Sequence, residues 1–373
     1  MQQPSPTSSS NRILSGMRST GKLHLGNFMG ALYNWVNLQN ETVQNDTDVT
    51  GRAKYECFFF LADWHALTTD YADTSRVKQN SIEVALDWLA AGLDPERSTL
   101  FIQSHVPQHA ELHLIFSMIT PLGWLERVPT YKEQIDNLRE KDLGTYGFLG
   151  YPLLQAADIL LYAASGNSKL WVPVGEDQVP HIELTREVAR RFNQFYKLPQ
   201  DELVFPEPQP LLTPTPKVPG TDGRKMSKSY NNYLLMSDPE ADIRSKLKTM
   251  VTDPARVRRT DPGNPEVCPV YGLHKVFSSE ETKKEVVAGC TTAGIGCIQC
   301  KSWCADAIVN VLNPIQERRR KYESNPKLVW EILQDGSKRA AVAANRTMTD
   351  VRASMDMGLA YEPANEAKAE ANG

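Results

Sequence analysis

The sequence lacks the features that mark membrane-spanning, exported or strongly basic proteins. Its 373 residues contain no apolar run that approaches the length of a membrane span. Residues 1–11 are rich in Gln, Pro, Ser and Thr and have neither a basic start nor a hydrophobic segment, so no secretory signal is expected there. The formal net charge is −4, which gives no general attraction to nucleic acid but is compatible with a local basic patch. We therefore expect a globular, cytoplasmic protein with no membrane partner.

Cysteine is also scarce, with six residues in the chain. In a reducing compartment these are expected to be free thiols or metal ligands rather than disulfides. The composition, 41% hydrophobic and 23% charged, is typical of a globular protein, and the length is enough for about two domains.

Strand and helix patterns alternate through the first half of the chain. Residues 57–62 form a continuous apolar run, which is typical of a strand buried on both faces of a sheet. Residues 81–93 place apolar side chains at helical spacing, with Gly92 near the expected end. This rhythm predicts an α/β fold with a parallel sheet and crossover helices. We expect further strands at 12–15, 99–103 and 171–174, helices at 26–38, 156–164 and 181–195, and a loop region at 206–223.

After about residue 235 the pattern becomes helical, and we place a domain boundary there. The predicted organisation is a disordered tail at 1–11, an α/β domain at 12–235, an all-α domain at 236–358 and a second disordered tail at 359–373.

The stretch from Gly16 to Asn27 follows an expected strand and opens an expected helix. Its small residues allow the backbone to approach a nucleotide closely, and His24 and Asn27 add side-chain donors. Taken alone, the stretch is more simply a Gly-rich turn with a capping Asn.

A second stretch, residues 223–229, carries Lys225 and Lys228 on a loop after a Pro-rich segment. Lysine ammonium groups on such a loop can close over a triphosphate and neutralise the leaving pyrophosphate. The alternative is a solvated basic turn, which is common for short Lys/Ser runs.

Together the two stretches resemble the HIGH and KMSKS motifs of class I aminoacyl-tRNA synthetases. They read His24-Leu25-Gly26-Asn27 and Lys225-Met226-Ser227-Lys228-Ser229. The second is a full match, and the first departs only at Asn27, which is similar to the tryptophanyl branch. Residues 151–162, 172–178, 181–186 and 313–319 also resemble that branch, so the resemblance covers 12–358. It implies a Rossmann-like catalytic domain followed by a helical tRNA anticodon-binding domain.

The resemblance also implies roles for individual residues. Asp158 would accept a hydrogen bond from the indole N–H of tryptophan, which fits the chemistry because indole offers one donor and no acceptor. Without the resemblance, the alternative that Asp158 is a helix residue in a salt bridge has equal weight. Tyr151, Gln155 and Gln178 would line the same pocket. The residues implied in ATP binding are Arg18, Ser19, Thr20, Gly26, Asn27, Gly175, Glu176, Asp177, Val218, Lys225, Met226, Ser227, Lys228 and Ser229. The catalytic set is His24, Asn27, Lys225 and Lys228.

Several positions depart from the family pattern. Gln155 stands where many bacterial members have Met, and residues 18–20 replace a Gln-Pro-Ser type triplet. Lys132 matches the first Lys of a Lys-Glu-Lys stretch, but Gln134 replaces the second, which leaves open how Mg²⁺ is handled.

The implied reaction joins L-tryptophan to ATP, with Mg²⁺, giving Trp-AMP and pyrophosphate, and then transfers tryptophan to tRNA(Trp). Members of the family are homodimers, so a homodimer is expected. Two alternatives stay open: a tyrosyl-tRNA synthetase, and a non-catalytic paralogue that binds tRNA or tryptophan.

Four cysteines form a further candidate site. Cys268, Cys290, Cys297 and Cys300 resemble in spacing a subgroup that carries a [4Fe–4S] cluster near the anticodon-binding region. A zinc ion and free thiols remain the alternatives. Cys304 is expected to be a spare thiol and Cys57 a core residue.

Two further groups have competing interpretations. His105, His109 and His113 are spaced by four and could form a metal face, but Pro107 argues against one continuous helix. The basic run 318–321, and the arginines at 256, 258 and 259, could contact tRNA phosphates or form a solvated face.

Overall fold

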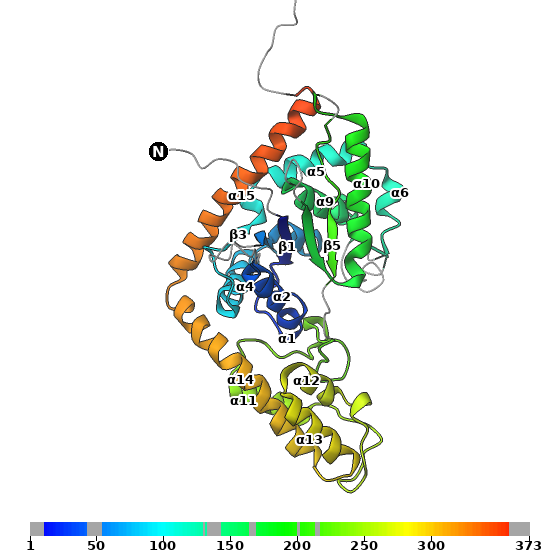
Figure 1. Cartoon of the computed structure of the whole chain (residues 1–373), viewed down its shortest axis with the longest axis vertical. Coiled ribbons are helices and arrows are strands. Elements are labelled where there is room, and N and C mark those ends of the chain that lie inside the picture. Colours follow the sequence, from blue (N-terminus) through cyan, green and yellow to red (C-terminus); the bar gives the residue numbers. More distant parts are fainter. Residues whose placement is uncertain are drawn as a thin grey trace, which may run out of the picture.

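The computed structural model describes residues 11–42, 54–129, 131–132, 143–163, 169–199, 202–212 and 217–357. The molecule is elongated (Figure 1), with a sheet-containing part at one end and helices α11 to α14 at the other. Gln134 and nearly all of both predicted tails lie outside the described residues.

Within the described part, the sheet has five parallel strands in the order β3-β2-β1-β4-β5. They are β1 (Asn11–Arg18), β2 (Tyr55–Ala62), β3 (Ser98–Ile102), β4 (Leu170–Val174) and β5 (Gln209–Leu212). The chain runs outward from β1 to β3 and then crosses back to β4, so the strand order reverses between β1 and β4. In open parallel sheets a crevice forms at the carboxyl ends of the strands at this point. The predicted Rossmann-like parallel sheet is confirmed.

Helices cover both faces of the sheet. Those of the sheet-containing part are α1 (Leu25–Asn27), α2 (Tyr33–Asn40), α3 (Asp63–Asp70), α4 (Val77–Ala91), α5 (Gln108–Ile119), α6 (Leu122–Leu125), α8 (Tyr146–Leu149), α9 (Tyr151–Leu161) and α10 (Val179–Phe195). A π-helical turn, η1 (Phe28–Leu32), joins α1 to α2, and short 3-10 turns follow β3 (η2, Gln103–His105) and β4 (η3, Glu176–Gln178).

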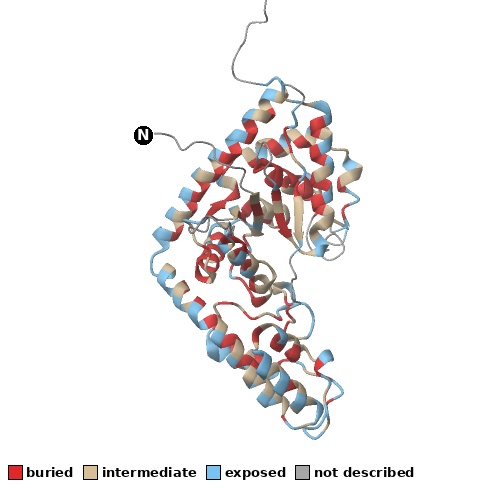
Figure 2. Cartoon of the chain, in the orientation of Figure 1, coloured by how far each residue is buried: buried red, intermediate tan, exposed pale blue. Residues whose placement is uncertain are grey.

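Alternating strand residues point to opposite faces, which explains the continuous apolar runs. Phe59 packs with Ile13 in the core under α2 and α4, where its ring stacks on Trp35 at 4.8 Å. Phe58 and Phe60 belong to the core on the other face, with residues of α9 and α10. Figure 2 shows buried residues concentrated around the sheet.

Helix boundaries follow local chemistry. Helix α4 ends at Gly92, whose φ of 115° is a left-handed conformation that suits glycine, as its position near the predicted helix end suggested.

One sequence prediction was wrong. Residues 206–223 were expected to be loop, but Gln209–Leu212 form β5, paired in parallel with β4. Pro210 is tolerated because β5 is an edge strand of the described sheet, and proline within sheets is confined to such strands, to strand starts and to bulges.

The C-terminal region is helical, as predicted. It contains α11 (Glu240–Thr249), α12 (Pro269–Phe277), α13 (Glu280–Thr291), α14 (Cys297–Glu323) and α15 (Pro326–Ser354). The 3-10 turn η5 (Lys228–Tyr230) precedes α11, and η6 (Pro265–Val267) lies between α11 and α12. In the described part of the chain, no helix is both long and apolar enough to span a membrane.

Helix α15 returns to the sheet and covers β3 (Figure 1). A Cβ on Gly336 would lie only 1.8 Å from Leu100 O, so glycine is needed for this approach. Ser337 Oγ accepts a hydrogen bond from the Ile102 N–H at 3.3 Å. The predicted 236–358 domain thus includes a helix that packs on the five-stranded sheet, and its boundaries stay a prediction.

Candidate active site

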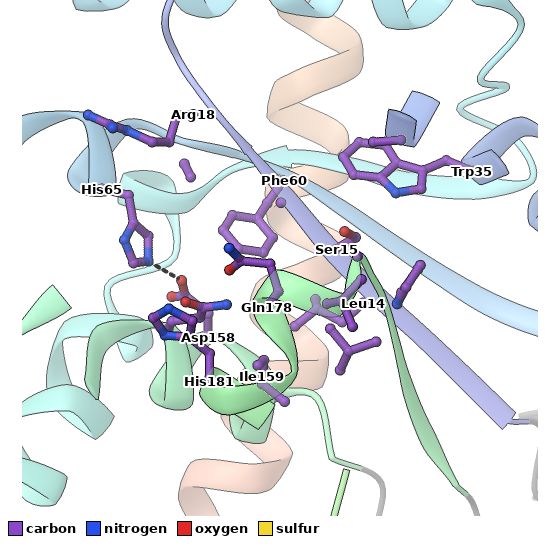
Figure 3. A pocket seen from close by; sticks show the side chains of 18 of the residues that line it. Leu14, Ser15, Arg18, Trp35, Phe60, His65, Asp158, Ile159, Gln178 and His181 are labelled. Carbon is purple, nitrogen blue, oxygen red and sulfur yellow. Dashed lines mark hydrogen bonds and ion pairs between the residues drawn. The ribbon is translucent and has the colours of Figure 1, made fainter. Parts of the chain in front are cut away.

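A cavity of about 400 Å³ opens where the strand order reverses. Its walls include Leu14, Ser15 and Gly16 from β1 and residues 172–174 from β4, together with side chains of α3, α9 and η3 (Figure 3). The cavity therefore lies where parallel α/β sheets usually bind ligands.

Asp158 lies on α9 in the wall of this cavity and is only 1% exposed. Its carboxylate accepts hydrogen bonds from Gln103 Nε2 at 2.8 and 2.9 Å, and contacts His65 Nε2 at 2.8 Å and His109 Nδ1 at 2.6 Å. Burial alone would raise the pKa of Asp158, but the hydrogen bonds and charge of His109 and His65 outweigh it and lower the pKa to about 2. Asp158 is therefore a carboxylate at neutral pH.

Sequence reasoning missed the three partners of Asp158. His65 follows β2 and Gln103 follows β3 directly, and the carboxyl ends of parallel strands were a signal that could have identified both. His109 was weighed only as a metal ligand. It is buried, and its Nε2 lies 2.9 Å from Tyr162 Oη, so the structure gives both ring nitrogens hydrogen-bonding partners.

The other residues that the resemblance assigns to the tryptophan pocket line the same cavity. Tyr151, Gln155 and Gln178 surround it with Asp158, and the Tyr151 ring packs against His181 at 5.8 Å. Figure 3 shows Gln178 and His181 on the Asp158 side of the cavity.

The first phosphate motif is held by a reciprocal cap. His24 Nδ1 accepts a hydrogen bond from the Asn27 N–H, and Asn27 Oδ1 accepts one from the His24 N–H, each at 3.2 Å. Because Nδ1 accepts, the neutral ring carries its proton on Nε2, which can donate to an anion. Burial, followed by the charges of Lys228 and Lys225, lowers the pKa of His24 to about 4. His24 is thus a neutral donor beside two lysines.

The second motif packs directly on the first. Lys228 Nζ donates hydrogen bonds to Thr20 O at 2.8 Å and Gly21 O at 3.2 Å. A Cβ on Gly26 would lie 2.9 Å from the His24 ring, so this glycine leaves room for the imidazole, and 3.6 Å from Met226 Cβ, which is an ordinary contact between the two motifs. Met226 is buried, whereas Lys225 is exposed.

Asn232 holds the lysine-bearing loop in shape. Its Oδ1 accepts from the Ser227 N–H at 2.8 Å, and its Nδ2 donates to Lys225 O at 3.2 Å. The main-chain oxygen of the buried Val218 accepts a hydrogen bond from the Met226 N–H at 3.2 Å. The exposed Ser229 donates its N–H to Ser227 Oγ at 3.3 Å.

Of the remaining residues expected to bind ATP, some line the cavity and others do not. Arg18 and Gly175 line the cavity, and burial lowers the pKa of Arg18. Glu176 and Asp177 are exposed on η3, and Thr20 is exposed beside Lys228. Ser19 is buried and accepts a hydrogen bond from Ser81 Oγ at 2.9 Å, so its side chain points to α4.

Comparison with known proteins identifies the family. The profile of the class I tRNA synthetases (W and Y) matches residues 7–313. A tryptophan–tRNA ligase of Thermotoga maritima is 53% identical, covering 93% of this chain and 99% of its own length. One from Ralstonia nicotianae is 46% identical over 94% and 99%.

The chain belongs to the tryptophan–tRNA ligases of class I.

A solved tryptophanyl-tRNA synthetase structure from Campylobacter jejuni, in complex with ADP and tryptophan, superposes with a TM-score of 0.78 at 30% identity, covering 92% of this chain and 99% of the other. The predicted family, fold class and enzyme class are therefore confirmed.

The four cysteines singled out in this synthetase line one small cavity in the helical part, together with Arg256. Cys297 and Cys300 lie in the first turn of α14, Cys268 precedes α12, and Cys290 lies on α13. Burial and the neighbouring thiols raise the pKa of Cys300 to about 12. Across the described residues, no group of three or more Cys, His, Asp or Glu side chains is arranged to hold a metal ion.

The other cysteines and basic residues are also placed. Cys304 and Cys57 are buried in the core and do not line the cysteine cavity. Arg256 is buried and donates to Ile295 O at 2.5 Å, so it is not part of a solvated face, whereas Arg258 and Arg259 are exposed.

Proposed function

We propose that the cavity between β1 and β4 binds tryptophan and that the adjoining contact of the two motifs binds the ATP phosphates. The observation that carries this proposal is the packing of Lys228 on the loop before His24, next to a cavity whose wall holds the buried carboxylate of Asp158. The tryptophan carboxylate attacks the α-phosphorus of ATP, the bond to pyrophosphate breaks, and Trp-AMP forms. The ribose hydroxyl at the tRNA 3′ end then takes the tryptophanyl group and releases AMP.

Catalysis in this scheme is positioning and charge stabilisation. Lys225 and Lys228 stabilise the charge of the leaving pyrophosphate. The Nε2–H of His24, the Asn27 side chain and Arg18 hold phosphate oxygens, and bound Mg²⁺ supplies further charge neutralisation. Lys228 is half-buried, and this burial lowers the pKa of its ammonium group. Its bonds to main-chain oxygens are exchanged for phosphate oxygens when ATP binds.

The remaining ATP contacts are proposed by position. Gly175, Glu176 and Asp177 serve the α-amino group and the ribose, and Val218 contacts adenine. Ser19 and Thr20 shape the first loop, while Met226, Ser227 and Ser229 shape the second.

Asp158 reads the indole N–H, with Tyr151, Gln155 and Gln178 around the ring. A carboxylate offers about four lone-pair sites, and its contacts with Gln103, His65 and His109 already use them. Indole binding therefore requires one of these partners to release its hydrogen bond to Asp158. His65 lines the cavity and its side chain is 12% exposed, whereas that of His109 is fully buried, so His65 is the partner that shifts.

We propose a [4Fe–4S] cluster at Cys268, Cys290, Cys297 and Cys300, with zinc as the alternative. Four thiols around one cavity are a suitable ligand set. The alternative, a zinc ion, would need its sulfur ligands about 2.3 Å away. Anaerobically purified protein is expected to contain iron and to absorb at about 400 nm.

The proposed partner is tRNA(Trp), and the proposed state is a cytoplasmic homodimer. Leu114, Met118, Leu122 and Tyr146 are 56–73% exposed on α5, α6 and α8, and such apolar exposure is typical of an interface. Light scattering is expected to give twice the chain mass.

The test of the function is ATP–pyrophosphate exchange with purified protein. Tryptophan should support exchange, and tyrosine should not at equal concentration. Exchange with tyrosine alone would favour the tyrosyl alternative, and its absence with both amino acids would favour a non-catalytic paralogue.

A further inference from the structure

The basic run 318–321 on α14 contains a residue that is not on the surface. Arg319 is only 3% exposed, although the exposed Arg320 and Lys321 follow it directly. Its guanidinium forms ion pairs with Asp87 and Glu83 on α4 and with Glu323 one turn along α14, the last at 2.8 Å. A charge is this deeply buried only when it is paired. The pairing joins α14 to the sheet-containing part.

Asp87 extends this contact to the first phosphate motif. It is 1% exposed, and its Oδ2 accepts a hydrogen bond from the Leu23 N–H at 2.7 Å. Leu23 immediately precedes His24, whose capping bonds with Asn27 set the position of the phosphate-facing imidazole. One carboxylate therefore receives Arg319 on one oxygen and the loop backbone on the other.

The same loop is held at further points by α4 and by the second motif. Ser81 Oγ donates to Ser19 Oγ at 2.9 Å, and a Cβ on Gly21 would lie 2.9 Å from Asn80 Oδ1. Lys228 reaches the loop through Thr20 O and Gly21 O. The negative charge of Asp87 also favours the ammonium form of Lys228. The loop thus lies between α4 with Arg319 and the lysine that we assign to pyrophosphate.

We propose that Asp87 and Arg319 are positioning residues for ATP, which fix the loop of residues 19–24 from behind and tie its position to helix α14. This inference rests on the proposed ATP site. Neither residue touches substrate. They set the positions of the His24 imidazole and of the loop's main-chain oxygens before ATP binds. Gln316 adds a second tie from α14, since its Nε2 donates to Met236 O at 2.9 Å and Asp238 O at 3.0 Å, just after the second motif.

The test uses the full-length protein and ATP–pyrophosphate exchange, with KM and kcat measured separately for ATP and tryptophan. The variants are Asp87→Asn, Arg319→Met and the double variant. We expect kcat/KM for ATP to fall about tenfold in each single variant, while KM for tryptophan stays within about twofold because neither residue lines the tryptophan cavity. The double variant should lose no more than the worse single variant, because the two residues act as one unit.

Arg318→Gln is the matched control. Arg318 is the neighbouring residue on α14 and donates to Ala90 O at 2.6 Å, so it joins the same two helices without reaching the loop. It should lower thermal stability without changing KM or kcat for ATP. A purely structural pair would behave like this control, so equal kinetics in Asp87→Asn and Arg318→Gln would overturn the proposal. If Asp87→Asn does not fold, Asp87→Glu and Arg319→Lys keep the charges and should show the same ATP-selective loss at smaller size. An equal loss toward both substrates in these variants also overturns it.

Failure of the proposed function is distinguishable. In that case the unmodified protein shows no tryptophan-dependent exchange, whereas failure of this inference leaves the unmodified protein active and the two variants without a selective loss toward ATP.

Discussion

Lys228 donates a hydrogen bond from Nζ to the main-chain oxygen of Thr20 at 2.8 Å, which joins two motifs separated by about 200 residues of sequence. Burial lowers the pKa of this ammonium group. This contact places a cation at the loop that precedes His24, and the proposed function assigns that cation to the phosphates of ATP.

Replacing Lys228 with Ala should lower kcat for tryptophan-dependent pyrophosphate exchange by about 100-fold, because a preorganised cation at the leaving group is lost. The initial rate of pyrophosphate exchange at saturating ATP and tryptophan measures this kcat. Lys284→Ala, which removes an exposed lysine on α13, is the control and should retain full activity. Full exchange by the Lys228 variant would show that another residue stabilises the pyrophosphate.

Replacing Asp158 with Asn should raise KM for tryptophan by about 10- to 100-fold, because one carboxylate oxygen that can accept the indole N–H becomes an amide donor. KM for ATP should change little, since Asp158 lies in the tryptophan cavity. Circular dichroism and thermal unfolding of the variant are needed as well, because Asp158 is buried with three partners. An unchanged KM for tryptophan in a folded variant would contradict the assignment.

His24 should titrate far below an ordinary histidine. Burial and the two lysines lower its pKa from 6.5 to about 4, so its contribution to folding stability is present above pH 6.5 and is lost as the pH falls toward 4. An NMR titration of the His24 ring in the absence of ATP should show a midpoint near 4. The signal is assigned from its disappearance in His24→Asn. A midpoint near 6.5 would mean that the imidazole is solvated and away from the lysines.

The cysteine site predicts a contrast between neighbouring thiols. The double variant Cys297→Ala/Cys300→Ala removes two of the four cysteines around the small cavity, and anaerobically purified protein should lose its bound iron. Cys304→Ala changes a buried cysteine one turn further along α14, and this variant should keep its bound iron. Iron content and visible absorbance report the outcome. Zinc in place of iron in the unmodified protein would favour the single-ion alternative.

Much of the fold could be predicted because its signals are local. The buried strand at Tyr55–Ala62 appears as one apolar run, and the stop of α4 at Gly92 follows from one residue type. The two motifs were identified through their resemblance to the HIGH and KMSKS motifs, since each stretch taken alone is more simply a turn. Strand β5 was missed because Pro210 argues against a strand unless its place at the sheet edge is known.

The rest depends on contacts between distant segments. Gln103 and His65 reach Asp158 across 55 and 93 residues, and the sequence gives no distance between them. Arg319 looked like part of a basic surface because its partner, Asp87, lies 232 residues away. Long-range pairs of this kind become visible only when tertiary packing brings the helices together.

The most direct test of the central claim is a crystal structure of the protein with tryptophan and a non-hydrolysable ATP analogue. We expect Lys228 Nζ within hydrogen-bond distance of the β- or γ-phosphate oxygens, His24 Nε2 on a phosphate oxygen, and the indole nitrogen on the Asp158 carboxylate. An analogue bound away from the contact of the two motifs, or an indole ring that does not face Asp158, would contradict the account.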